Sequence, residues 1–153
     1  DFTSADTERH SFDADTIQEV EPMTYTSFVN ALSVITVAGV KRQYTAPPSQ
    51  LSSADLPAMH PQLPEHTQDI ISIASNTGLF VVTCELAIVV KANSQGDAAA
   101  NFAECLTLMD ALNDALTDNT SALNIDRWSM RQDGVTYGDT AYWTIVARVE
   151  ASE

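Results

Sequence analysis

The sequence feature that most constrains the fold is the apolar run from Leu79 to Ala92. Every second residue from Phe80 to Val90 is apolar, and the residues between them are mostly apolar too, apart from Thr83 and Glu85. Successive side chains of a strand point to opposite faces of a sheet, so both faces of this strand would be apolar. Such a strand needs cover on both sides. The run therefore predicts a central strand.

The segments around this run predict an antiparallel or mixed sheet. Ser75–Gly78 has the residues of a tight turn, so the strand-like run before it would form a hairpin with the central strand. Near the C-terminus, Asp133-Gly134 and 137–139 supply turn residues between two further runs. Five segments have strand-like patterns: 40–45, 69–74, 79–92, 125–132 and 140–151.

Two other segments have the three- and four-residue apolar spacing of helices. The first follows Thr24 or Thr26 as N-cap, includes Ile35 and ends before Gly39. The second spans Asp97–Leu116, and its predicted buried side falls within roughly 120° of arc. That side consists of Phe102, Cys105, Leu106, Met109, Leu112 and Leu116. We therefore expect an α+β fold, with about five strands packed with two helices.

Ala46–Pro64, between the first helix and the hairpin, contains five prolines in 19 residues. Proline is excluded from helix interiors and disfavoured in central strands, so we expect an extended segment here. Ordered loops of this length in compact domains are usually functional. This segment is therefore a candidate for a contact surface.

The chain has 153 residues, a length typical of one domain. Residues 1–22 differ from the rest: they hold seven acids, one Arg and few apolar residues. The composition predicts an acidic N-terminal arm without a core of its own, followed by a single α+β domain over residues 23–153. If the arm is ordered, it would lie either on its own domain or on a neighbouring subunit.

Acidic residues outnumber basic ones 21 to 7, giving a formal net charge of −14. Nucleic-acid affinity and attraction to anionic membranes both depend on Lys and Arg, so this charge argues against both partners. No apolar run is long enough to span a bilayer. Cys84 and Cys105 are too few for a disulfide framework and are expected to be small buried hydrophobic residues.

The sequence contains no recognisable catalytic or metal motif: no nucleophile elbow, phosphate-binding glycine loop or HExxH. His60 and His66 lie in the proline-rich segment near Glu65 and Asp69, but their spacing matches no metal signature, and solvated loop histidines are the expectation. With His10 in the arm, these are the three histidines. We expect no enzyme activity, no cofactor and no metal.

The second predicted helix carries acids on its polar side and no Lys or Arg. Two interpretations are open for Asp110, Asp114 and Asp118. They form either an ordinary solvated face or a wall past which a polyanion such as DNA moves without sticking, because negative charge repels phosphate.

Five stretches resemble, in the same order, the tail terminator proteins of long-tailed bacteriophages. The resemblance runs over about residues 24–151 and does not include the acidic arm. The stretches are YTSFVNAL (25–32), GVKRQY (39–44), PPSQLSSADLPAMHPQLP (47–64), ANFAECLTLMDAL (100–112) and YGDTAYWTIVARVEA (137–151).

This resemblance implies a structural virion protein of the tail or neck, assembled in the host cytoplasm. Such proteins form a ring, usually of six copies, that caps the tail tube and stops its polymerisation. The implied partners are other copies of the chain, the tail tube protein and a head-side connector, and DNA passes without specific binding. If such a ring forms, subunit contacts would come from the extended segment and nearby strand edges, with two tyrosines near the C-terminal turn as further candidates. The candidate contacts are Pro48, Leu51, Leu56, Pro57, Tyr137 and Tyr142.

Two other functions remain open from the sequence. One is a different neck component, such as a head–tail joining or tail-completion protein. The other, of a different class, is an acidic DNA mimic that inhibits a host enzyme, which would be a monomer or dimer rather than a ring.

Overall fold

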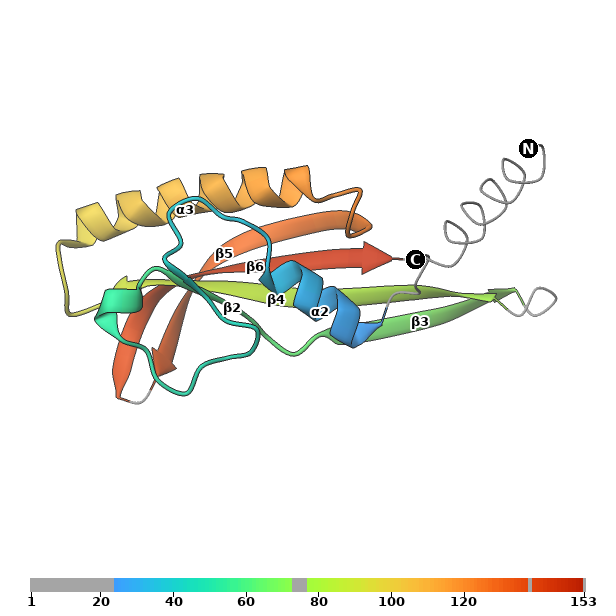
Figure 1. Cartoon of the computed structure of the whole chain (residues 1–153), viewed down its shortest axis with the longest axis horizontal. Coiled ribbons are helices and arrows are strands. Elements are labelled where there is room, and N and C mark those ends of the chain that lie inside the picture. The colour runs from blue at the N-terminus through green and yellow to red at the C-terminus, as the bar shows by residue number, and fades with distance from the viewer. Residues whose placement is uncertain (1–23, 73–76, 138, 153) are drawn as a thin grey trace, which may run out of the picture.

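The computed structural model describes residues 24–72, 77–137 and 139–152, with the side chains of 65–72, 77–80, 135 and 137 outside that description (Figure 1). Two helices, α2 (Tyr25–Ser33) and α3 (Ala98–Asp118), accompany a mixed sheet. The predicted α+β fold is confirmed. The acidic arm lies outside the described residues, as do Ser75 and Asn76 of the predicted turn.

The sheet has the order β1-β2-β4-β6-β5, and β3 also pairs with β4. β2 and β3 pair one after the other with the same edge of β4, β2 with Leu86–Val89 and β3 with Thr77–Thr83. β6 pairs with the other edge of β4 from Val81 onward. Among the strands of the described residues, only β1 and β2 pair in parallel. The strands are β1 (Arg42–Gln43), β2 (Ala58–Pro61), β3 (Glu65–Ser72), β4 (Thr77–Ala92), β5 (Ile125–Tyr137) and β6 (Thr140–Ser152).

β4 is the central strand that the apolar run predicts. Val82, Leu86 and Ile88 lie on the face covered by the helices and belong to the main hydrophobic core. Val89 lies on the opposite face, which we call the second face, and is also fully buried. Both faces of β4 are thus covered over its C-terminal half.

Near its start, β4 extends beyond β6. Pairing between β4 and β6 begins at Val81, whereas β3 pairs with β4 from Thr77 onward. In the described part of the chain, residues 77–80 therefore form a two-stranded ribbon with β3, which projects away from the helices in Figure 1. The predicted hairpin is present, and β3 begins four residues earlier than expected.

α2 begins at a capping box. The Thr24 hydroxyl accepts from the Ser27 backbone N–H, and the Ser27 hydroxyl accepts from the Thr24 backbone N–H. Thr24 is thus the cap, and the helix ends at Ser33, with Val34 as C-cap. The prediction that Gly39 ends this helix is wrong. Gly39 has φ +91° in a later turn, where a Cβ would lie 3.2 Å from Leu108 Cδ2 of α3.

The buried side of α3 differs from the predicted one. Phe102 and Leu106 are 53% and 47% exposed, whereas Leu108 is buried. Asn101 is also buried, and its amide Nδ2 is satisfied by donating to the Gln95 carbonyl at 2.9 Å. The helix is rotated so that its core-facing line passes through Asn101, Cys105, Leu108, Leu112 and Ala115.

The proline-rich segment contains a strand inside the sheet. β2 lies between β1 and β4, although prolines argued against a central strand. Pro57 precedes the strand and Pro61 is its last residue, so the interior N–H groups remain available. The rest of the segment, including a short 3₁₀ turn (Ser53–Asp55), covers part of the second face through Leu51 and Leu56.

The C-terminal hairpin is longer than predicted. Asp133 and Gly134 lie within β5, opposite Thr144 and Trp143 of β6, so they are not the turn. The pairing extends to Tyr137 opposite Thr140. Asp133 and Gly134 do not interrupt the pairing of the two strands, because β6 is long enough to pair with β5 on both sides of them.

Candidate interaction surfaces

The acidic residues singled out on α3 share one exposed face. Asp110, Asp114 and Asp118 all point away from the sheet. A fourth α3 acid, Glu104, pairs with Lys91 of β4 at 3.9 Å on one flank of the helix. The three carboxylates are thus exposed on one side of α3, and their role along a DNA path stays a prediction.

The predicted subunit contacts of the proline-rich segment are mostly used within the chain. Leu56 and Tyr142 are 6% and 8% exposed and pack together in one small cluster on the second face. Pro57 is buried, whereas Leu51 packs against the cluster and remains partly exposed. Buried side chains offer almost no surface to a second copy, so Leu56, Pro57 and Tyr142 are corrected to internal packing residues.

Two of the candidate contacts have a different status. Pro48 is partly exposed in the segment that follows β1. Tyr137 lies at the end of β5, and its side chain is outside the described part of the protein. Their role in contacts between copies stays a prediction.

His60 is buried rather than in a solvated loop. Only 2% of it is exposed, on β2, and its Nδ1 lies 3.0 Å from the Pro61 carbonyl oxygen. Burial lowers the pKa of His60, because the charged imidazolium loses its hydration. Across the described residues, no group of three or more His, Cys, Asp or Glu side chains is arranged to hold a metal ion.

Both thiols are buried, as predicted from the sequence. Cys84 is fully buried on the helix-covered face of β4, and Cys105 lies on the inner side of α3. Burial raises the pKa of Cys84 to about 11. Because the thiolate is the reactive form, Cys84 is unsuited to act as a nucleophile at neutral pH.

The uncovered part of the second face carries ion pairs. Arg131 Nη1 lies 2.7 Å from a Glu85 carboxylate oxygen, and Arg127 pairs with Glu150 at 3.2 Å. Arg131 also lies 3.7 Å from Asp133. Each of these two arginines has an acidic partner, so the pairs create no cationic surface for an anion.

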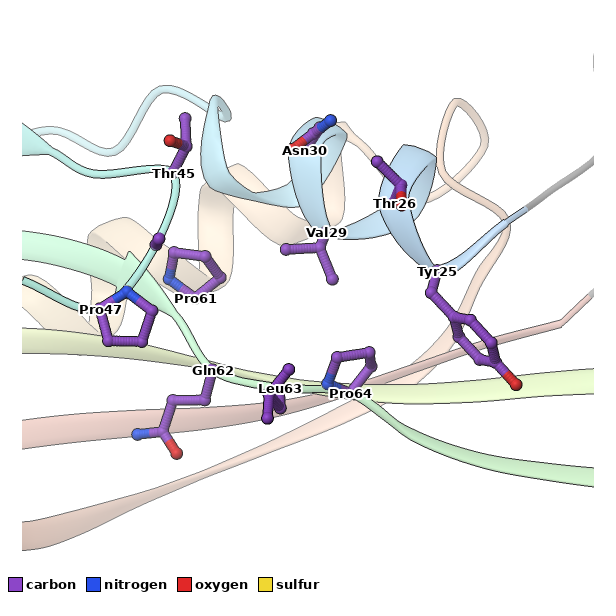
Figure 2. A pocket seen from close by; sticks show the side chains of 11 residues that line it. Tyr25, Thr26, Val29, Asn30, Thr45, Pro47, Pro61, Gln62, Leu63 and Pro64 are labelled. Carbon is purple, nitrogen blue, oxygen red and sulfur yellow. The ribbon is translucent and has the colours of Figure 1, made fainter.

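An open groove lies beside α2, at the β1–β2 edge of the sheet. Its volume is about 290 Å³, and it is bounded by α2, by residues 45–47 and by residues 61–64. Figure 2 shows Val29 pointing from α2 toward the 61–64 segment, with Tyr25 at one end and Pro47 at the other. Leu63 is 91% exposed at this site. We call this feature the α2 groove.

The opposite side of the domain carries an apolar ridge. Phe102, Leu106 and the half-buried Met109 recur at four- and three-residue spacing on the flank of α3 that faces β5. Asn113 continues this flank and accepts a 2.9 Å hydrogen bond from Trp128 Nε1 of β5. We call Phe102, Leu106 and Met109 the α3 ridge.

The sequence predicts these surfaces only in part, because the extended segment 46–64, a candidate contact surface, supplies most of the α2 groove, whereas the α3 ridge is not predicted. Sequence analysis assigned Phe102 and Leu106 to the core, since apolar spacing does not show which flank of a helix is covered. It placed no side chains of α2 and residues 61–64 together, since those segments are some 30 residues apart in the chain. The one available signal was Asn101, whose amide interrupts an otherwise apolar helix side.

No protein-family model matches the chain, and no curated protein matches it. Among the described residues, no helix is long and apolar enough to cross a membrane.

Proposed function

We propose that the protein is a structural virion subunit that assembles into a ring with copies of itself and acts as a tail terminator. In this role the ring caps the tail tube, stops its polymerisation, joins it to the head-side connector and lets DNA pass. The observation that carries the self-assembly is the pair of exposed apolar surfaces, the α2 groove and the α3 ridge, at opposite edges of one sheet.

Two different surfaces at opposite edges favour head-to-tail contacts. Contacts of this kind generate a ring when the rotation between neighbours closes. Exposed apolar residues that are grouped, rather than scattered singly, are typical of protein interaction sites. The specific role at the end of a phage tail rests on the sequence resemblance over residues 24–151.

The acidic face of α3 supports passage of DNA through such a ring. Asp110, Asp114 and Asp118 are exposed together, and α3 has no Lys or Arg to bind phosphate. A negative wall repels the backbone of DNA and prevents it from sticking. If these carboxylates line the path, their joint replacement by Lys slows or blocks DNA passage without preventing ring assembly. Unchanged infectivity would leave them as a solvated face.

The assembled mass in solution is the first test. Light scattering on the purified chain is expected to give a closed assembly of about six copies, visible as rings by negative staining. A monomer or dimer at every concentration would contradict the proposal and favour the DNA-mimic function.

Tail length separates a terminator from another neck component. In a phage that encodes this protein, loss of a terminator leaves overlong tail tubes. Loss of a head–tail joining protein leaves tails of normal length that are not attached to heads. Negative-stain images of tails from a strain lacking the protein distinguish these outcomes.

A further inference from the structure

We infer that the outer edge of β5 in one copy pairs with the outer edge of β3 in the next copy, so that the sheet continues from subunit to subunit. The inference rests on the proposed self-assembly and names the two strands that make the contact. In the described part of the chain, β5 pairs only with β6 and β3 pairs only with β4. Each strand therefore keeps one edge at which another strand can pair.

Both edges are long enough for such pairing. β5 spans 13 residues and β3 spans eight, whereas β1 spans only two. Neither β3 nor β5 contains proline, so each outward N–H group can donate. An unpaired edge of this length is a template for a strand of another chain.

The directions of the strands suit a ring. Each step from β3 through β4 and β6 to β5 is antiparallel, so β3 and β5 run in opposite directions. A rotation about an axis along the strands keeps these directions, so β5 of one copy meets β3 of the next as an antiparallel pair. Contacts between two different edges generate a ring when the rotation closes.

The ribbon formed by β3 and the start of β4 has room for a third strand. Residues 77–80 of β4 pair with β3, whereas pairing with β6 begins at Val81. Two-stranded hairpins are marginally stable in water, and a third strand stabilises them. A neighbour's β5 along the outer edge of β3 supplies that strand over part of the ribbon.

Two arginines lie near the outer edge of β5, on the second face. The side chains of Arg127 and Arg131 are 77% and 49% exposed. Their partners Glu150 and Glu85 belong to β6 and β4, on the inner side of β5, and Asp133 belongs to β5 itself. A guanidinium has five N–H donors, so each arginine can also bind a carboxylate that approaches from outside the sheet.

The backbone register places two acidic residues at matching positions of β3. Glu65 is opposite Thr83 of β4, Thr83 is opposite Glu150 of β6, and Glu150 is opposite Arg127. Directly opposite residues of neighbouring strands share a face of the sheet, so Glu65 has a position on the second face. Asp69 is four residues further along β3, so its position is on the same face.

One antiparallel register brings both pairs of opposite charges together. Its opposed residues are Arg131 with Glu65, Ser129 with Thr67, and Arg127 with Asp69. A shift of two residues in either direction loses both ion pairs, and in one direction it places Glu65 opposite Asp133. Opposite charges directly across two strands stabilise their pairing, whereas like charges oppose it. The charges therefore select this register and a second copy of the chain as the partner.

Two charge-reversed variants test the contact, one on each strand. The β5 variant is Arg127→Glu with Arg131→Glu, and the β3 variant is Glu65→Arg with Asp69→Arg. Each variant alone is expected to lower the apparent association constant by at least roughly tenfold, because like charges then meet across the contact.

Matched controls make the same changes of charge elsewhere. Lys41→Glu with Arg42→Glu is the control for the β5 variant, and Asp110→Arg with Asp114→Arg is the control for the β3 variant. All four control positions are exposed and lie outside β3 and β5. Both controls are expected to assemble like the unaltered chain.

Mixing the two variants gives the decisive result. The acidic β5 of one variant then meets the basic β3 of the other, and the unaltered strands of the two variants also complement each other. The mixture is expected to form rings in which the two variants alternate, visible by native mass spectrometry as equal numbers of each. A mixture that assembles no better than either variant alone would overturn the inference.

The remaining outcomes separate the inference from the proposed function. If the unaltered chain forms rings and each variant alone still forms them, the inference is wrong and the proposed function stands. If the unaltered chain is monomeric, the proposed self-assembly itself is wrong. Circular dichroism verifies that each variant is folded. If a reversed variant unfolds, Arg127→Gln with Arg131→Gln and Glu65→Gln with Asp69→Asn replace the reversals, and each is expected to weaken association.

Discussion

The two faces of the sheet are covered in different ways. Among the described residues, the helix-covered face holds a core of 20 buried residues from both helices, four strands and the segment after α2, whereas the cluster on the second face has five. The small cluster lies beneath the proline-rich segment, and beyond it Glu85 and Arg131 face solvent as an ion pair. β4 is thus apolar on both faces, although helices cover only one face and an extended segment covers part of the other.

The helices on one face and the extended segment on the other also differ in the sequence pattern by which each can be recognised. A helix that covers a sheet repeats apolar residues every three to four positions, so it can be recognised. An extended segment makes its contacts at irregular intervals, as Leu51 and Leu56 do. Such a cover resembles a free loop in sequence, which is why the sequence predicts subunit contacts at Leu56 and Pro57, although both are buried within the chain.

The largest effect is expected from a truncation on the helix-covered face. Leu112 is fully buried on α3, so Leu112→Ala is expected to lower the free energy of unfolding by about 3 kcal/mol. Urea denaturation measures this loss. The control is Leu106→Ala on the same helix, which is 47% exposed and is expected to cost much less. Equal losses would mean that the core side of α3 is assigned wrongly.

A smaller loss is expected on the second face. Leu56→Ala removes a buried side chain from the five-residue cluster, and the loop above it can relax, so the expected cost is about 2 kcal/mol. Leu63→Ala, at a 91% exposed position, serves as its control. A loss at Leu56 greater than that at Leu112 would reverse the ranking of the two faces.

The second face is also expected to weaken in acid, through His60. Its pKa is lowered in the folded state from the ordinary value of 6.5, so below that pH the unfolded chain binds a proton that the folded chain resists. Stability from the neutral imidazole is thus present above pH 6.5 and is lost as the pH falls below it. His60→Gln removes this contribution. Urea denaturation at several pH values is expected to show a shallower decline for the variant, and identical profiles would contradict the buried placement.

The smallest effect is expected at the ion pairs on the uncovered part of the second face. The Arg131 side chain is 49% exposed, and exposed pairs contribute little because water screens them. Arg131→Gln is therefore expected to lower the free energy of unfolding by at most about 1 kcal/mol, with less effect at high salt. A loss comparable with that of Leu112→Ala would show that this region depends on charge rather than on apolar burial.

Much of the fold could be predicted because its elements have strong local signals. The two-sided apolar pattern of β4 and the α+β fold are confirmed, and of the two N-caps that the sequence leaves open, Thr24 is the one used. The interior position of β2 could not be predicted, because its prolines lie at the ends, where they remove no ladder hydrogen bond from its middle. The extra length of β5 depends on pairing with β6, a partner that local turn residues do not reveal.

The candidate surfaces were less predictable than the fold. The acidic face of α3 follows from the sequence, since like charges at helical spacing fall on one side. The α2 groove and the α3 ridge do not, because each depends on which side chains remain uncovered after the core has formed.

The sequence by itself determined a central strand buried on both faces, the two helices of the described residues and an acidic helix side, because these properties depend on periodicity and composition. Only the tertiary structure decided what covers the second face and which flank of α3 stays exposed. The physical reason is that periodicity gives the direction of side chains within one element, whereas burial depends on a partner supplied by a distant part of the chain.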